Sequence, residues 1–378
     1  MRLGEVIAAR RLHVHDAPHL IAAIELDGID ETIAALPNTD AVFLVWAGDQ
    51  SAYLAKTSML RRRLLRILKA GQAGARKSLN LREVVTRVEY WLTASCFESM
   101  LLHYALARAH FPEDYTRLVK LRMPAYVKLV LANEFPRTQV TTRLTGGASL
   151  YYGPFRTRAA AELFENQFLD LFQIRRCQEN LEPSTQHPGC IYGEMNMCLR
   201  PCQQIVGVEE YQSEVNRVRE FLTGNGASLI GITTAARDRL STEMNFEEAA
   251  RQHKRIERIT EVLTLRDDLA GDIDRLHGVA VAPATTPESV LLWFFSQGTW
   301  QLPVHFPLTS HVSLDQRLRE LVRSLQPIAA PLSEKQEHLA MLARWHYSTW
   351  SDGEWIGFRS WEDVPYRKLV RAISRVRK

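Results

Sequence analysis

Three side chains that could act on a phosphodiester lie close together in the sequence, Tyr53, Lys56 and Arg63. A phenol can orient or deprotonate a water, and an ammonium and a guanidinium can stabilise charge that develops on phosphate. Residues 41–46 and 52–56 have the composition of two short strands joined by a turn, and 57–70 that of a helix capped by Thr57 or Ser58. This unit predicts that the three side chains meet at a strand end and on the first helical turns. A basic surface helix after a hairpin is the alternative.

Basic residues are concentrated in the predicted helix. They include Arg61, Arg62, Arg66 and Lys69, and a second basic cluster ends the chain at 367–378. The net charge is only +4, so this local clustering says more than the sum. Such a face can bind a phosphate backbone, or it can be an ordinary solvated helix face.

Four of the five cysteines lie in one short window, at Cys177, Cys190, Cys198 and Cys202. In a cytosolic protein, clustered cysteines favour a metal site over disulfides. The irregular spacing, with Pro201 beside the last cysteine, favours an iron–sulfur cluster over zinc, although four thiolates can hold either. Four unrelated buried thiols are the alternative.

The remaining sequence predicts several modules of an α/β protein. Residues 126–155 contain two apolar β-runs separated by Asn-Glu-Phe-Pro, with Gly146-Gly147 as a turn, and a helix follows at 156–172. Residues 207–265 predict a helical hairpin with arms at 209–224 and 234–265, in which Phe246 supplies buried area and small alanines allow close helix packing. Strand-like runs return from 276 and predict a C-terminal α+β module.

The order of motifs resembles that of the UvrC family, the endonuclease component of the excinuclease ABC system. The motifs are YLAK at 53–56, LRRRL at 60–64, EFPR at 134–137, YYGPF at 151–155 and the four cysteines. The resemblance implies that residues 36–120 form a GIY-YIG-like endonuclease domain with a mixed sheet and flanking helices. It places AVF at 41–43 and YLA at 53–55 on the two signature triplets, and Lys56 and Arg63 on active-site positions.

The nuclease-like segment departs from the family pattern at several positions. His103 stands where the family has its metal-binding Glu, and Tyr115, Phe43 and Ala55 replace a family Asn, Tyr and Gly. A carboxylate suits Mg²⁺, whereas an imidazole suits softer metals. We therefore predict that cleavage is impaired and that Mg²⁺ or Mn²⁺ is needed only if the nuclease is active. An active nuclease with Glu98 or Glu89 as a displaced carboxylate is a further alternative.

The resemblance also assigns the cysteines and part of the helical hairpin. It implies that the four cysteines hold a [4Fe-4S] cluster, with zinc as the alternative. Residues 245–256 resemble the UVR motif, through which the family binds a subunit-B-like helicase; matching positions include Phe246, Glu247, Ala249 and Ala250. His253 and Lys254 depart from that motif.

These observations predict a DNA-binding protein of nucleotide-excision repair with impaired cleavage. A non-catalytic adaptor that recruits a subunit-B-like helicase to DNA is the alternative. Because no long apolar run or leader pattern is visible, we expect a cytoplasmic protein without a membrane partner. The predicted segments are an N-terminal extension (1–35), the GIY-YIG-like domain (36–120), linking strands with the cysteine segment (121–206), the UVR-type hairpin (207–265) and the C-terminal α+β module (266–378).

Overall fold

The computed structural model describes residues 19–21, 28–68, 81–325, 330–350 and 352–376. Two compact units divide the chain: one contains residues up to 121 with 277–329 and 344–378, and the other contains 122–276 with 330–343. The five segments predicted from the sequence are a finer division and stay a prediction. Lys69, one of the predicted DNA-binding residues, lies outside the described residues.

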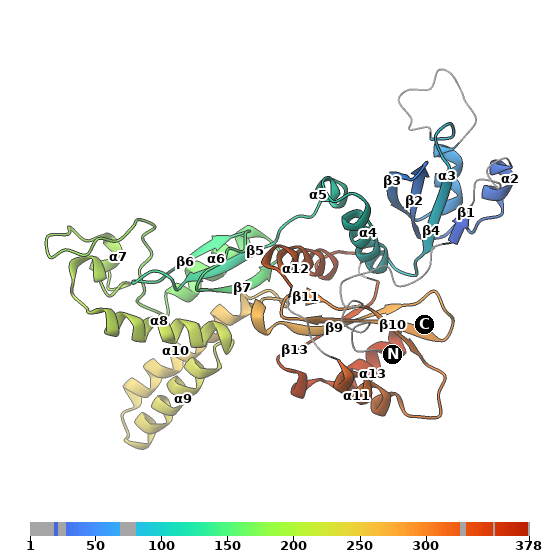
Figure 1. The fold of residues 1–378 in the computed structure, drawn as a ribbon. Coiled ribbons are helices and arrows are strands. Elements are labelled where there is room, and N and C mark those ends of the chain that lie inside the picture. Colours follow the sequence, from blue (N-terminus) through green and yellow to red (C-terminus); the bar gives the residue numbers. More distant parts are fainter. Residues whose placement is uncertain (1–18, 22–27, 69–80, 326–329, 351, 377–378) are drawn as a thin grey trace. The chain divides into compact units, whose positions relative to one another are not determined.

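The first sheet of the first unit has the strand order β1-β4-β2-β3 (Figure 1). Its strands are β1 (His19–Ile21), β2 (Ala41–Ala47), β3 (Gln50–Thr57) and β4 (Arg87–Leu92). Each described pairing in it is antiparallel, so the predicted mixed sheet is wrong. For β2 and β3 the reason is local, because Gly48 and Asp49 alone separate them and so short a connection can only form a hairpin.

Helices cover both faces of this sheet. On one face, α2 (Ile29–Ala34) and α3 (Leu60–Ile67) pack on the alternate side chains Ala41, Phe43 and Val45. On the other face, α4 (Cys96–His110) contacts β3 and β2. The cores on the two faces consist of residues that alternate along each strand, as expected for a pleated sheet.

Helix α3 begins later than the sequence predicts. Strand β3 continues to Thr57, and the residue before the helix is Met59, whose side chain makes no capping hydrogen bond. The predicted caps Thr57 and Ser58 are therefore wrong; Thr57 Oγ1 instead accepts a hydrogen bond from the Met59 amide at 3.1 Å. The strand prevailed because Thr57 pairs with Ala41 in the ladder.

A second sheet completes the first unit, with the order β11-β10-β9-β13 and β12 paired to β10. Its strands are β9 (His277–Pro283), β10 (Ser289–Ser296), β11 (Thr299–Trp300), β12 (Val304–Pro307) and β13 (Glu354–Phe358). Helices α11 (Leu314–Ser324) and α13 (Tyr366–Val376) contribute to the apolar core on one face. Within the same unit, Phe97 of α4 stacks on Trp345, with ring centroids 4.3 Å apart, and the Asp352 carboxylate accepts hydrogen bonds from the first amides of α4.

The sheet of the second unit has the order β6-β5-β7-β8. Its strands are β5 (Ala125–Val130), β6 (Arg137–Thr141), β7 (Ser149–Phe155) and β8 (Gly271–Asp272). The second predicted β-run of 126–155 forms two strands, β6 and β7, on either side of the predicted turn at Gly146-Gly147. Helices α6 (Arg158–Leu169) and α8 (Val208–Thr223) join these strands in one apolar core, and α12 (Leu332–His346) lies largely in residues assigned to this unit.

The helical region 207–265 contains three helices where two arms were predicted. They are α8, α9 (Ala227–Thr242) and α10 (Phe246–Thr264), and α9 and α10 pack as a hairpin. The predicted second arm breaks because Met244 has a left-handed backbone, with φ of 58°. Asn245 then caps α10 by accepting a hydrogen bond from the Glu248 amide.

Candidate functional site

Tyr53 and Arg63 meet on the α3 face of the first sheet. Arg63 Nη2 donates a hydrogen bond of 2.6 Å to Tyr53 Oη, and both side chains are partly buried. Tyr53 extends from the edge strand β3 and packs against the core below α3. The guanidinium and the phenol are therefore held together, as the sequence predicted for this pair.

A basic depression adjoins this pair. It is lined by Thr57, Ser58, Met59, Arg62, Arg63 and Arg66. Arg62 and Arg66 are exposed and lie one helical turn apart. Among the residues that the structure describes, no carboxylate lies within ion-pair distance of these arginines. Guanidinium and hydroxyl donors without an acidic partner form a surface suited to an anion such as phosphate.

Arg61, another predicted DNA-binding residue, does not line this depression. Arg61 Nη1 donates to the Ala34 carbonyl at 3.1 Å and is thus turned toward α2. In contrast, the hydroxyls of Thr57 and Ser58 belong to the lining, although the sequence suggested only capping roles for them. Their position directly before a basic helix was the available signal.

Lys56 and His103 lie together on the opposite face of the sheet. Side chains alternate along β3, so the Lys56 side chain extends from the face that α4 covers, whereas the Tyr53 side chain extends toward α3. Among the described residues, no hydrogen bond or ion pair links Lys56 or His103 to Tyr53 or Arg63. The structure therefore divides the predicted constellation into two pairs.

Burial controls the charge of the His103 imidazole. Its side chain is only 8% exposed, and this burial, followed by the nearby Lys56 charge, lowers its pKa from 6.5 to about 4. The pKa of Lys56 is itself lowered, first by the protein that surrounds its ammonium and then by Arg344. His103 is thus a neutral imidazole near pH 7, next to a cation.

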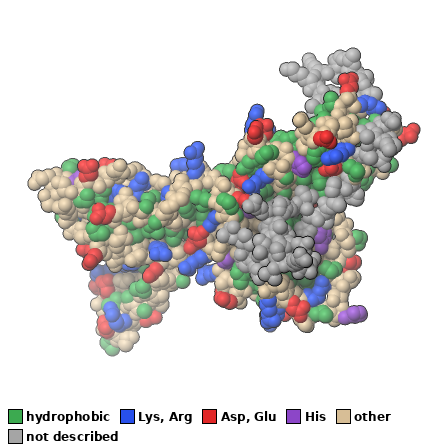
Figure 2. Space-filling view, in the orientation of Figure 1, with side chains coloured by type: hydrophobic (Ala, Val, Ile, Leu, Met, Phe, Trp, Pro, Cys, Tyr) green, Lys and Arg blue, Asp and Glu red, His purple; other side chains and the backbone are tan. Residues whose placement is uncertain are grey.

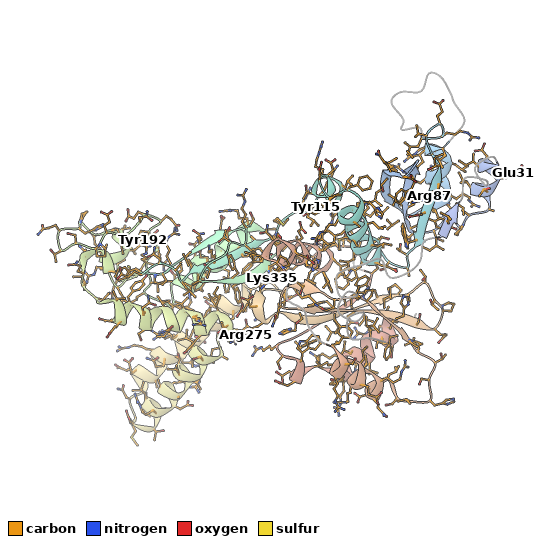
Figure 3. The ribbon with its side chains drawn as sticks, viewed as in Figure 1. Glu31, Arg87, Tyr115, Tyr192, Arg275 and Lys335 are labelled. Atoms are coloured by element: carbon orange, nitrogen blue, oxygen red, sulfur yellow. The ribbon has the colours of Figure 1, made fainter. Side chains whose placement is uncertain are left out.

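The carboxylates considered as replacements are engaged elsewhere. Glu98 Oε2 accepts from the Ala94 amide at 2.8 Å, and the Glu98 amide donates to the N-cap Ser95 hydroxyl, an arrangement that stabilises the start of α4. Glu89 forms an ion pair of 3.3 Å with Arg87, which Figure 3 labels. Glu89 alternates with the core residues Val88 and Tyr90, so it faces away from α3. Neither carboxylate lines the basic depression.

Tyr115, at the family Asn position, lies at the start of α5 (Tyr115–Val119) and is labelled in Figure 3. Its ring meets that of Tyr104 edge-on, with centroids 6.5 Å apart, and Arg108 lies over it. These two ring contacts are both made with α4.

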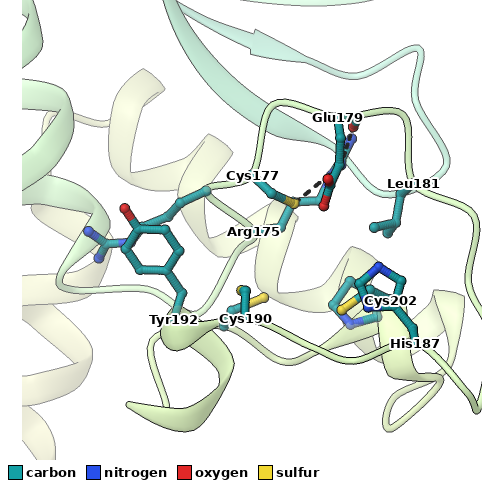
Figure 4. A pocket seen from close by; sticks show the side chains of 11 residues that line it. Arg175, Cys177, Glu179, Leu181, His187, Cys190, Tyr192 and Cys202 are labelled. Carbon is teal, nitrogen blue, oxygen red and sulfur yellow. Dashed lines mark hydrogen bonds between the residues drawn. The ribbon is translucent and has the colours of Figure 1, made fainter.

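The four predicted cysteines line one pocket in the second unit (Figure 4). Cys198 and Cys202 are buried, Cys177 is partly exposed and Cys190 is exposed. Cys190 is the N-cap of the short helix α7 (Ile191–Glu194), and His187 also lines the pocket. Burial, and to a smaller extent the other three thiols, raises the pKa of Cys198 to about 11.

Two observations bear on whether these residues fit a metal centre. As the side chains stand, no group of three or more His, Cys, Asp or Glu in the described part of the chain is arranged to hold a metal ion. The donor chemistry nevertheless fits: four thiols share one pocket with Arg175, whose buried Nη2 has no hydrogen-bond partner among the described atoms. A buried cation facing thiols matches an anionic, thiolate-bound centre.

The predicted partner-binding residues differ in exposure. Phe246 is 65% exposed, so the expectation that it supplies buried area in the hairpin is wrong. Phe246 is the first residue of α10. Of the four predicted partner-binding residues, Ala249 alone is buried. Glu247 and Ala250 are exposed. Figure 2 shows basic and acidic side chains interspersed over the face that it presents.

Comparison with known proteins shows which proteins this chain is similar to. Residues 125–221, which contain all four pocket cysteines, match the model of the UvrC/Cho excinuclease middle domain. The chain is also similar to proteins named UvrABC system protein C. The protein of that name from Lachnospira eligens is 25% identical over 275 residues, which cover 71% of this chain and 44% of that protein. The one from Moorella thermoacetica is 28% identical over 273 residues, with the same coverage of 71% and 44%.

The similarity covers only part of these proteins. The protein from Bdellovibrio bacteriovorus is 26% identical over 244 residues, 64% of this chain and 39% of that protein. The chain thus spans less than half the length of the curated relatives it matches. No solved structure matches it. In the described residues, no helix has the length and apolar character needed to cross a lipid bilayer.

Proposed function

We propose that this UvrC-related chain binds DNA in nucleotide-excision repair through the α3 face of its first sheet, with impaired cleavage. The observation that carries the proposal is the basic depression beside the Tyr53–Arg63 pair. Arg62 and Arg66 offer exposed guanidiniums, and Thr57 and Ser58 offer hydroxyls. These donors suit the backbone phosphates of DNA, which dominate affinity irrespective of base sequence.

Cleavage is impaired in this proposal because the site has phosphate-binding groups without an anchor for a hard cation. His103 is neutral and lies on the face opposite Arg63, and Glu98 and Glu89 are engaged in a helix cap and an ion pair. Mg²⁺ and Mn²⁺ prefer carboxylate oxygens. Tyr53 would orient water in an active enzyme, but here its hydroxyl accepts the hydrogen bond from Arg63.

The cofactor proposed for the second unit is a [4Fe-4S] cluster held by Cys177, Cys190, Cys198 and Cys202, with zinc as the alternative. The support is the shared pocket and its buried guanidinium. A cluster would supply a cross-link among segments that contain little regular structure between α6 and α8.

A second candidate function is that of an adaptor that recruits a subunit-B-like helicase to DNA. The exposed apolar side chains at the start of α10 favour it, because Phe246 is 65% exposed and Met244 is 78% exposed. Exposed aromatic and Met side chains are frequent at the centres of protein interfaces. This function is compatible with DNA binding and does not need cleavage.

DNA binding is tested by fluorescence anisotropy on duplex DNA over a salt series. The double variant Arg62→Gln/Arg66→Gln should bind at least about ten-fold more weakly, with the slope of log affinity against log salt reduced by about 2. The matched control is Arg158→Gln/Arg237→Gln, which removes two basic residues whose ion pairs lie outside the depression. Equal affinity and slope for wild type and the first variant would reject the proposed interface.

A further inference from the structure

Arg175 is a fully buried cation beside the cysteine pocket. Its side chain is 1% exposed, and its Nε donates to the Phe135 carbonyl at 2.9 Å. Its Nη1 donates to the Glu179 carbonyl at 3.0 Å and to Cys177 Sγ at 3.6 Å, as the dashed lines of Figure 4 show. Its Nη2 is buried and, in the described structure, has no hydrogen-bond partner.

The charge of Arg175 is not balanced by a carboxylate in the described part of the chain. Two of its three acceptors are neutral carbonyl oxygens, and the third is the Cys177 sulfur. Its neighbour Arg176 differs, because Arg176 Nη2 pairs with Asp170 at 2.9 Å. A guanidinium stays protonated in proteins, and an uncompensated buried charge is strongly destabilising.

A metal centre in this pocket would provide the missing negative charge, because cysteines bind metals as thiolates. Four thiolates with one Zn²⁺, or with a [4Fe-4S]²⁺ core, leave a net charge of about −2 on the centre. Arg175 contacts one of these four sulfurs directly, so its charge lies next to this excess.

We propose that Arg175 is the built-in counter-cation of a tetrathiolate metal centre in this pocket. It is a positioning residue that acts through the Cys177 sulfur, and the inference rests on the cofactor proposed above. Its positive charge stabilises the metal-bound state over the metal-free state. With an iron–sulfur cluster it also favours the reduced form, because reduction adds a further negative charge beside the guanidinium.

The test compares Arg175→Gln, which removes the charge, with Arg175→Lys, which keeps it but loses the fork geometry. The control Arg158→Gln removes a charge from an exposed ion pair with Glu162. Metal release to a chelator should be at least about ten-fold faster in Arg175→Gln, as for other losses of groups around metal ligands. The reduction potential of its cluster should shift to a more negative value. Arg175→Lys should retain most of the wild-type potential, and Arg158→Gln should match wild type.

Thermal unfolding separates this role from a purely structural one. A structural Arg175 would stabilise the metal-bound and metal-free chains equally and leave the potential unchanged. If Arg175 is a counter-cation, replacing it by Gln should lower the stability of the metal-bound chain more than that of the metal-free chain. If Arg175→Gln does not fold, Arg175→Lys decides between the two roles. A reduction potential of Arg175→Lys that differs from the potentials of wild type and of Arg158→Gln contradicts the charge role.

The outcomes also distinguish this inference from the proposed cofactor. Anaerobically purified wild-type protein without iron or zinc would remove the cofactor proposal, and the role of Arg175 with it. Wild-type protein with metal, together with an Arg175→Gln variant that has unchanged release rate and potential, would overturn the role of Arg175 alone. For a zinc centre, the release rate is the deciding measurement.

Discussion

The first sheet and the cysteine pocket bring their predicted residues together to different degrees. In the sheet, the predicted residues separate into a Tyr53–Arg63 pair and a Lys56–His103 pair on opposite faces. In the pocket, all four predicted cysteines line one space, together with the buried Arg175. This difference underlies the proposal that the chain binds phosphate and holds a metal through its four clustered cysteines, and that its proposed hydrolytic site is incomplete.

The largest expected effect is the loss of bound metal from the cysteine pocket. Cys198→Ser replaces a buried thiol of the pocket, and we expect bound iron or zinc to fall to background with a marked loss of thermal stability. Structural metal binding contributes directly to folding free energy. Metal analysis and visible absorption after anaerobic purification provide the measurement. Cys96→Ser is the control, because Cys96 is exposed and lies outside the pocket; full metal retention in Cys198→Ser would contradict the assignment.

The next largest effect is on the pH dependence of stability and concerns His103, beside the first sheet. Its pKa of about 4 in the folded chain is below its ordinary value of 6.5, so the unfolded state binds the proton more tightly. The contribution of the neutral imidazole is complete above about pH 6.5 and is lost as pH falls toward 4, by about 3 kcal/mol in all. His103→Gln should remove this part of the acid sensitivity, measured by denaturant unfolding from pH 7 to 4. The exposed His253→Gln is the control, and an unchanged pH dependence in His103→Gln would show that the imidazole is not buried as described.

A smaller effect sharpens the description of the retained pair. Tyr53→Phe removes the acceptor of the Arg63 hydrogen bond and should lower the free energy of unfolding by about 1 kcal/mol. A double-mutant cycle with Arg63→Gln should give a coupling of similar size. Additive effects in that cycle would mean that the two side chains do not interact in solution.

The smallest effect on stability is expected at the hairpin. Phe246→Ala should change the free energy of unfolding by less than about 0.5 kcal/mol, because the ring is exposed. If the adaptor function holds, the same change should weaken binding to a subunit-B-like helicase by at least about ten-fold. Ile232→Ala, at an exposed apolar residue of the neighbouring helix α9, is the matched control. An equal loss of binding in both variants would indicate no specific role for Phe246.

The sequence predicted elements better than it predicted their ends and faces. The β2–β3 hairpin and α3 follow from apolar runs and turn residues, but the start of α3 depended on Thr57 pairing with Ala41 in the ladder. Only that pairing could show that Thr57 belongs to a strand. The break at Met244 was hidden because the residues on both sides form good helices.

The candidate sites show the same limit. Period-two alternation could have indicated that Tyr53 and Lys56, three residues apart on one strand, point to opposite faces. The role of Arg175 could not be inferred, because its acceptors at Phe135 and Glu179 come from segments whose approach depends on tertiary packing. Clustering in the sequence was sufficient to predict that the four cysteines lie close together, since they belong to one loop-rich segment.

An incision assay tests the central claim most directly. Wild-type protein and His103→Ala are incubated with damaged duplex DNA and Mg²⁺ or Mn²⁺, and binding is measured on the same samples. We predict that both proteins bind the duplex and that neither cuts it appreciably. Robust cutting by wild type that disappears in His103→Ala would contradict the claim, because His103 would then be a working member of a hydrolytic site.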